Sequence, residues 1–163
     1  MLYRAIYISA CFAFISFQQA QAQPQSFELL KTLNASATEG AAIFSTSPEK
    51  SGESRRLTLL LVLKSPQPDT TISYVKTPVV IDCKTAAYRF LAKPTAFDSN
   101  DKPIQEDSPT PDFDLATSRP IDTSDVDAPA PMPAAFQYAC RGKTPLKRFD
   151  SLAGALSFER GPN

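Results

Sequence analysis

The sequence predicts an α+β fold that is mainly β: a small antiparallel sheet with a C-terminal helix tethered by a disulfide, plus a mobile acidic, Pro-rich loop. Beyond the N-terminal segment the apolar runs are short and bounded by charge or proline, as at 59–63, which favours strands. Polar turns join these runs without a helical stretch of about 10 to 15 residues, which favours antiparallel pairing over βαβ units. Two cysteines, Cys83 and Cys140, remain once that N-terminal segment is removed. The length of 163 residues fits one domain.

The first 22 residues have the layout of a secretory signal peptide. Arg4 is the only charge before Glu28, and an apolar run covers 5–17. Ala20-Gln21-Ala22 then has the A-x-A pattern of a cleavage site. As a helix the apolar run would be about 20 Å long, too short for a hydrocarbon core of about 30 Å. The segment predicts export with cleavage after Ala22, and lipidation at Cys11 stays open as an alternative.

The cysteines of the processed chain predict a disulfide. Removal of 22 of the 163 residues leaves 141, from Gln23 to Asn163. Cys11 leaves with the leader, so Cys83 and Cys140 enter an oxidising compartment as a pair. Closing a loop of this length would stabilise the fold by about 4 kcal/mol. The alternative is two free or redox-active thiols, which would lack the usual CxxC spacing.

Five segments are expected to form strands. The run at 59–63 predicts a central strand, covered on both faces for part of its length. The β-branched content at 79–83 predicts a second strand. Residues 86–93 alternate with the period of a half-buried strand. Weaker candidates lie at 27–33 and 41–45.

Two short helices are expected near the C-terminus. Pro133 is placed to open a helical turn in which Phe136, Ala139 and Cys140 share a face. A bond from Cys140 to Cys83 would fasten that turn to the sheet. A second helix is expected to begin with Asp150 as its N-cap.

The composition changes sharply between 98 and 132. From Asp98 to Asp127 there are nine acidic residues against Lys102 and Arg119, a balance of minus 7, and seven prolines lie between Lys102 and Ala134. Such a segment buries too little apolar surface to offset its ordering entropy, so a mobile acidic loop is expected. An EF-hand is excluded, because Pro103 stands where the calcium loop needs glycine. A looser calcium site remains an alternative.

Catalytic classes are mostly excluded by composition. The chain has no His, so Ser-His-Asp triads and His-ligated metal sites cannot form. Its net charge is zero, and it has no phosphate-binding glycine motif. Ser45, Ser47 and Ser51 have no His to activate them, and a dyad with Lys50 has no supporting motif. We therefore expect no enzymatic activity, no cofactor, no metal, no nucleic acid and no small-molecule substrate.

A basic cluster follows Cys140. It consists of Arg141, Lys143, Lys147 and Arg148. These are candidate polyanion-binding residues, suited to anionic lipid headgroups, lipopolysaccharide or an acidic polysaccharide. The alternative is a solvated basic tail over 141–163, or one that folds against the acidic loop.

Several short motifs follow one another between about 27 and 140. They are Ala42-Ile43-Phe44, Ser54-Arg55-Arg56-Leu57-Thr58-Leu59, Val80-Ile81-Asp82-Cys83, Tyr88-Arg89-Phe90, Asp98-Ser99-Asn100-Asp101-Lys102-Pro103-Ile104 and Ala135-Phe136-Gln137-Tyr138-Ala139-Cys140. In this order they resemble the bacterial surface-adhesin protein E family. The resemblance implies a compact antiparallel sheet with a helix tethered by Cys83 and Cys140. It also implies a Gram-negative envelope location and binding to host extracellular proteins, and it assigns no ligand-binding residue.

These features predict an exported bacterial envelope protein with one domain over 23–163, located in the periplasm or on the outer cell surface. Its expected role is that of a non-enzymatic binding module for a protein partner, with contact to an anionic surface through the basic tail. The alternative is a periplasmic structural or assembly accessory with no host target. Exposure on intact cells distinguishes the two. The sequence leaves the oligomeric state open.

Overall fold

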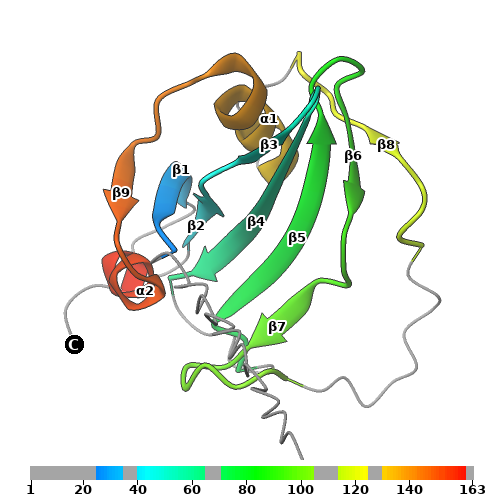
Figure 1. Ribbon diagram of the computed structural model, residues 1–163. Helices are drawn as coiled ribbons and strands as arrows, with labels where there is room; N and C mark the ends of the chain where they lie inside the picture. Colours follow the sequence, from blue (N-terminus) through cyan, green and yellow to red (C-terminus); the bar gives the residue numbers. More distant parts are fainter. Residues whose placement is uncertain (1–24, 35–39, 65–70, 105–113, 125–129, 161–163) are drawn as a thin grey trace, which may run out of the picture.

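A computed structural model describes residues 25–34, 40–64, 71–104, 114–124 and 130–160 of the chain (Figure 1). The predicted leader, with Arg4, Cys11 and Ala22, lies outside the described residues. Two stretches of the predicted acidic loop, 105–113 and 125–129, also lie outside them. No helix in the described ranges is long and apolar enough to cross a membrane.

The described residues form one antiparallel sheet of nine strands, which confirms the predicted fold class. Its order is β8-β6-β5-β4-β2-β1-β9, while β3 pairs with β4 and β7 pairs with β5. The strands are β1 (Phe27–Asn34), β2 (Gly40–Thr46), β3 (Glu49–Ser51), β4 (Ser54–Leu63), β5 (Tyr74–Asp82), β6 (Ala87–Phe90), β7 (Thr95–Phe97), β8 (Arg119–Pro120) and β9 (Lys147–Phe149).

Strand β4 is central, as its apolar run predicts. It pairs with β2 on one side and with β5 on the other. Leu57 and Leu59 pack on one face of the sheet, and Leu60 and Val62 pack on the opposite face. Burial on both faces explains why the apolar run is continuous and does not alternate.

Two helices cover opposite faces of the sheet. Helix α1 (Pro131–Arg141) packs through Ala135 and Phe136 on the side of Leu57. Helix α2 (Leu152–Arg160) packs through Ala155 on the side of Leu60. Figure 1 shows α1 behind the upper part of the sheet and α2 at its lower edge, beside β9. The fold is therefore a three-layer arrangement with a shared central sheet.

Helix α1 begins at Pro131, two positions before the predicted start at Pro133. It ends at Arg141 and is capped by Gly142, whose φ of 68° is the left-handed conformation that glycine adopts readily. The amide of Lys143 then donates to the carbonyl of Gln137 at 3.0 Å. Cys140 lies in the last turn and is bonded to Cys83, with 5.3 Å between the two Cα atoms. The predicted disulfide and the tethered helix are confirmed.

The start of α2 differs from the prediction. The expected N-cap was Asp150, but the amide of Gly154 donates to the Oγ of Ser151 at 3.1 Å. The amide of Ala155 donates to the carbonyl of Ser151 at 3.2 Å, so the helical hydrogen bonds begin there. Ser151 is therefore the N-cap, because its hydroxyl oxygen accepts the amide of Gly154, a first-turn amide that has no acceptor within the helix.

The described parts of the acidic segment are ordered by their own carboxylates. Oδ1 of Asp98 accepts the amides of Asn100 and Lys102 at 2.8 and 2.9 Å. Oδ1 of Asp114 accepts the amide of Ala116 at 2.8 Å. Strand β8 then pairs with β6 at the sheet edge. The described parts therefore form turns and a short strand, since turn-forming aspartates satisfy the backbone locally, and the mobility of the loop stays a prediction.

Candidate functional site

The segment from Arg141 to Phe149, which holds the four candidate cations, is not a free tail. It leaves α1, runs along the outer side of β1 and becomes β9, as Figure 1 shows. Strand β9 pairs with the first residues of β1, with Phe149 opposite Phe27 and Lys147 opposite Leu29. The expectation of a basic tail over 141–163 is wrong there, because β1 offers an unpaired edge to residues that are otherwise too few and too charged to predict a strand.

Arg148 is committed to a partner inside the protein. Its Nη2 lies 2.6 Å from Oε1 of Glu28. Glu28 is also the residue of β1 that lies directly opposite Arg148 of β9 in the sheet. The Glu28 side chain is 0% exposed and that of Arg148 is 65% exposed. The partner is thus a buried acid of β1 and not the acidic loop, and one of the four candidate cations is neutralised.

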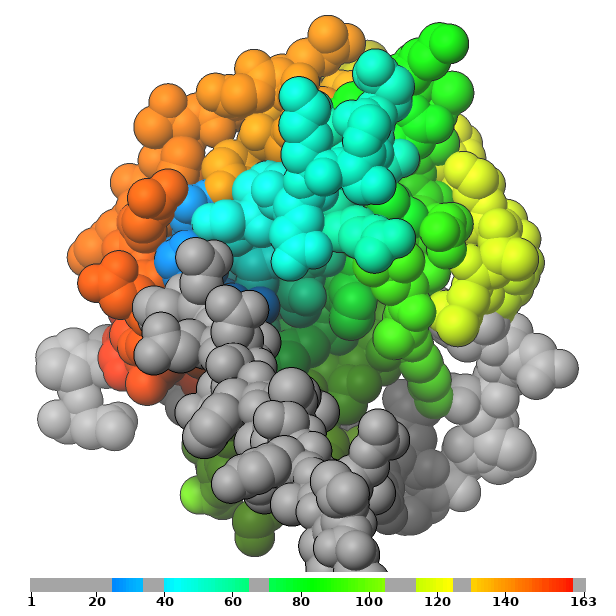
Figure 2. All heavy atoms as spheres, in the orientation of Figure 1, coloured from blue at the N-terminus to red at the C-terminus, as the bar shows by residue number. Residues whose placement is uncertain are grey.

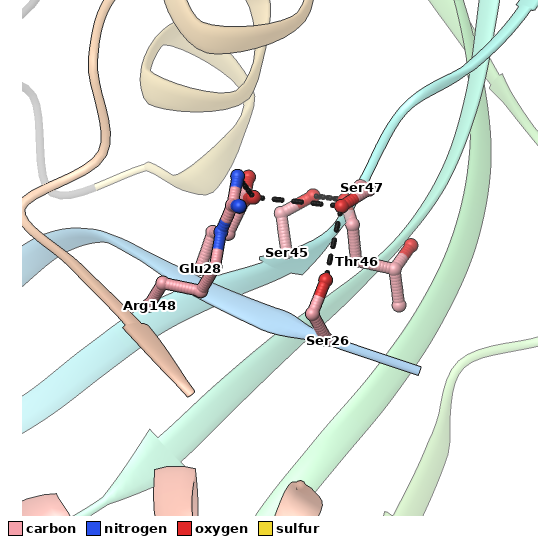
Figure 3. Close-up of polar contacts among 6 residues, drawn as sticks. All are labelled: Ser26, Glu28, Ser45, Thr46, Ser47 and Arg148. Atoms are coloured by element: carbon pink, nitrogen blue, oxygen red, sulfur yellow. Dashed lines mark hydrogen bonds and ion pairs between the residues drawn. The ribbon is translucent and has the colours of Figure 1, made fainter. Parts of the chain in front are cut away.

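The surroundings of Glu28 are polar and lie on the α1 side of the sheet (Figure 3). The hydroxyl of Ser47 donates to Oε1 of Glu28 at 3.4 Å, and Ser26 and Ser47 are joined through their hydroxyls at 3.1 Å. Ser45 is buried and donates to the carbonyl of Thr46 at 2.8 Å. Oε2 of Glu28 has no hydrogen-bond partner among the described residues. Oε1 of Glu28 therefore anchors the guanidinium of Arg148, while Ser47 supports the same oxygen.

Glu28 carries no signal that marks it in the sequence. It alternates with the buried Phe27 and Leu29, so the strand period places it on the opposite face, where a charged residue is ordinary. Its burial follows from β9 and from the loop after β2, and both are contacts over long sequence separations. Only the tertiary structure assigns the pair.

The other three cations lie at exposed positions. Arg141 ends α1 with its guanidinium 5.5 Å from the ring centroid of Phe136. Lys143 follows the turn at Gly142 and borders a small hollow of about 50 Å³ between α1 and β1. Lys147 places its ammonium 5.2 Å from the ring of Phe149 and 4.9 Å from that of Phe158. These cations remain available to an anionic partner.

Two large apolar side chains are exposed beside these cations. Leu146 is 64% exposed, although its amide donates to the carbonyl of Leu29 at 2.7 Å. Phe158 of α2 is 41% exposed and contacts the ring of Phe149 at 5.4 Å. Figure 2 shows the segment after α1, in orange, along the edge of the molecule and beside α2 in red. Sequence reasoning missed both residues, because their exposure depends on how β9 and α2 dock.

An open cleft of about 500 Å³ lies on the α2 side of the sheet. Phe27, Leu60 and Pro78 contribute apolar surface to it, and Lys76 lines it too. Partial burial lowers the pKa of Lys76, whose ammonium lies 4.5 Å from the ring of Phe97. The lysine is therefore held against the aromatic pair of Tyr74 and Phe97, which stack at 4.9 Å.

Nothing in the described ranges groups three or more Cys, Asp or Glu side chains closely enough to hold a metal ion. Comparisons with protein-family models, with curated proteins and with solved structures find no match to this chain.

Proposed function

We propose that this protein is exported to the envelope of a Gram-negative bacterium and acts there as a non-enzymatic binding module of the surface-adhesin protein E type. The observation that carries the proposal is the bond between Cys83 and Cys140. Structural disulfides persist in oxidising compartments and are rare in the cytosol. The bond agrees with the leader that the first 22 residues predict.

The exposed surface supports a binding role. Lys147 and the exposed Leu146 and Phe158 lie along the edge formed by β9 and α2, and a cleft opens on the same side as α2. Surfaces of this mixed kind suit a macromolecular partner, because apolar contacts supply affinity while charges orient the partner. A host extracellular protein is the partner class that the family resemblance suggests.

Intact-protein mass spectrometry on native material tests the export step. The expected mass is that of a chain starting at Gln23, with Cys83 and Cys140 resistant to alkylation until a reductant is added. A mass that retains Met1, or two thiols alkylated without reduction, would contradict the proposal. A diacyl or triacyl mass on Cys11 would instead identify an anchored lipoprotein of the same envelope.

Protease treatment of intact cells tests the binding role. A surface-displayed binding module is degraded on intact cells, whereas a periplasmic accessory is degraded only after the outer membrane is opened. A periplasmic protein with known protection serves as the control for membrane integrity. Protection of this protein to the same extent would replace the host-binding role with the structural or assembly role.

A further inference from the structure

We propose that the edge formed by Arg141, Lys143, Leu146, Lys147 and Phe158 docks on an anionic phospholipid surface. We call these five residues the docking rim. The inference rests on the proposed export, since it requires the protein to meet an envelope membrane. In this proposal the partner of the basic segment is a lipid bilayer, which contacts the apolar side chains of the rim as well as its cations.

The segment that supplies most of the rim, residues 141–149, carries a local excess of positive charge. Residues 141–149 contain four cations and no acid. Arg148 is paired with the buried Glu28, so the net surplus comes from the remaining three cations. Asp150 is the first acid that follows in the chain. A chain with no net charge thus presents a local cationic edge, and each such cation is attracted to anionic headgroups.

The rim also presents apolar side chains to solvent. Among the described residues the large hydrophobics that are exposed are Leu91, Leu115, Leu146 and Phe158. Leu146 is the most exposed of them at 64%, and it lies directly before Lys147. Lys147 lies over the ring of Phe158, which joins cation and aromatic side chain in one patch. Apolar side chains flanked by cations are typical of interfacial anchors, which bury the former below the headgroups that hold the latter.

The rim is held rigid by the fold. Hydrogen bonds to β1 fix Leu146 and β9, and the Glu28–Arg148 pair fastens β9 from the α1 side. The disulfide at Cys140 fixes the chain one residue before Arg141. A surface that is already arranged loses little entropy on docking.

A bilayer fits this rim better than a soluble polyanion does. A polysaccharide or another anionic chain would contact the cations and would gain nothing from Leu146, because it has no apolar interior. A bilayer uses both. The apolar residues therefore distinguish the two partners, and their substitution is the informative experiment.

The test uses the processed protein and two kinds of vesicle. One is pure phosphatidylcholine and the other is phosphatidylcholine mixed in equal parts with phosphatidylglycerol. The wild-type protein is expected to sediment with the anionic vesicles only. Leu146→Ser with Phe158→Ser, and separately Lys143→Gln with Lys147→Gln, are each expected to weaken this binding about tenfold. The control Leu91→Ser with Leu115→Ser removes two other exposed apolar side chains, which lie outside the rim, and is expected to bind like wild type.

A fluorescence readout tests insertion directly. The chain has no Trp, so Leu146→Trp introduces a single indole. Its emission is expected to shift to the blue on anionic vesicles, while that of Leu115→Trp stays unchanged. Thermal unfolding of each variant establishes that it is folded.

Three outcomes overturn the proposal. They are no binding to anionic vesicles, equal binding to both kinds of vesicle, and binding that is lost with the lysines but indifferent to Leu146 and Phe158. The third outcome identifies a polyanion contact through charge alone. Any of them leaves export intact when the native mass starts at Gln23, so the two proposals fail separately.

Discussion

Arg148 and Glu28 lie 120 positions apart in the chain, yet Nη2 of Arg148 is 2.6 Å from Oε1 of Glu28. The two residues are also register partners across β9 and β1. The side-chain contact and the strand pairing therefore reinforce each other. The pair fixes the edge strand on which the docking rim is built.

Removal of Arg148 is expected to destabilise the protein. In Arg148→Ala the buried carboxylate of Glu28 loses its strongest partner, which costs about 2 kcal/mol of unfolding free energy. Glu28→Gln combined with Arg148→Ala is expected to cost less than Arg148→Ala alone, since no charge is then left buried. Urea unfolding of Arg148→Ala, of Glu28→Gln and of the variant with both substitutions checks this. Additive losses would show that the two residues do not interact.

Loss of the disulfide is expected to cost more. The bond closes a loop with a sequence separation of 57, and chain entropy assigns about 4 kcal/mol to such a loop. Cys83→Ala with Cys140→Ala should therefore unfold at a clearly lower urea concentration. Reduced and alkylated wild-type protein is the matched comparison and should behave alike. A variant as stable as the oxidised protein would refute this role.

The start of α2 gives a paired test. Ser151→Ala removes the hydroxyl that accepts the amide of Gly154, and is expected to lower the unfolding free energy by about 1 kcal/mol. Asp150→Ala is expected to change it little, because no described contact makes Asp150 the cap. Ser157→Ala serves as a control within α2, since its hydroxyl only donates to the carbonyl of Ala153. The opposite ranking of Ser151 and Asp150 would restore the sequence-based prediction.

Acid is expected to destabilise the protein through its turns. The amide of Lys84 lowers the pKa of Asp82, the amide of Lys102 lowers that of Asp98, and the hydroxyl of Thr117 lowers that of Asp114. A carboxyl whose pKa is lower in the folded state stabilises the fold above the unfolded-state pKa, and this contribution is lost as the pH falls through the folded-state pKa.

The unfolding free energy should thus decrease from about pH 4 downward. Burial raises the pKa of Glu159, and this acts in the opposite direction, because its contribution is lost as the pH rises. Urea titrations at several pH values measure the slope. Replacement of all three aspartates by Asn keeps the acceptor oxygens and should flatten the decrease. An unchanged slope would assign acid sensitivity to other groups.

The hydroxyl group of Tyr74 allows a test of what it costs to bury a polar group that has no hydrogen-bond partner among the described residues. The ring of Tyr74 is fully buried as well. Tyr74→Phe is expected to raise the unfolding free energy by about 1 kcal/mol, because it removes an unsatisfied buried oxygen. Tyr74→Ala is expected to lower it by about 4 kcal/mol, since it also removes the stacked ring. A loss of stability in Tyr74→Phe would reveal a partner for the hydroxyl.

Strands β4 and β9 show which features a sequence can predict. Burial of β4 on both faces appears locally as a run of apolar residues, so its position follows from composition alone. Strand β9 has three residues, two of them charged, and becomes a strand only because β1 lies beside it. The Glu28–Arg148 pair was unpredictable for the same reason.

The candidate site follows the same division. The disulfide was predictable, because Cys83 and Cys140 are the two cysteines left once the predicted leader is set aside, and the cations were visible as a cluster. The exposure of Leu146 and Phe158 was not predictable, since it is decided by packing between segments distant in sequence. The strand expected at 79–83 is longer in the structure: β5 begins at Tyr74 and runs through Pro78, which lies opposite Thr58.

The acidic segment 98–132 lies wholly between the two bonded cysteines. A protease that cuts once within it therefore divides the main chain without dividing the molecule. The C-terminal fragment, with α1, β9 and α2, stays covalently joined to the fragment that holds β1 to β5, and nicked protein migrates as one species until a reductant separates the two. The sheet and its helices thus have two covalent connections, and cleavage of the proline-rich one leaves the other intact.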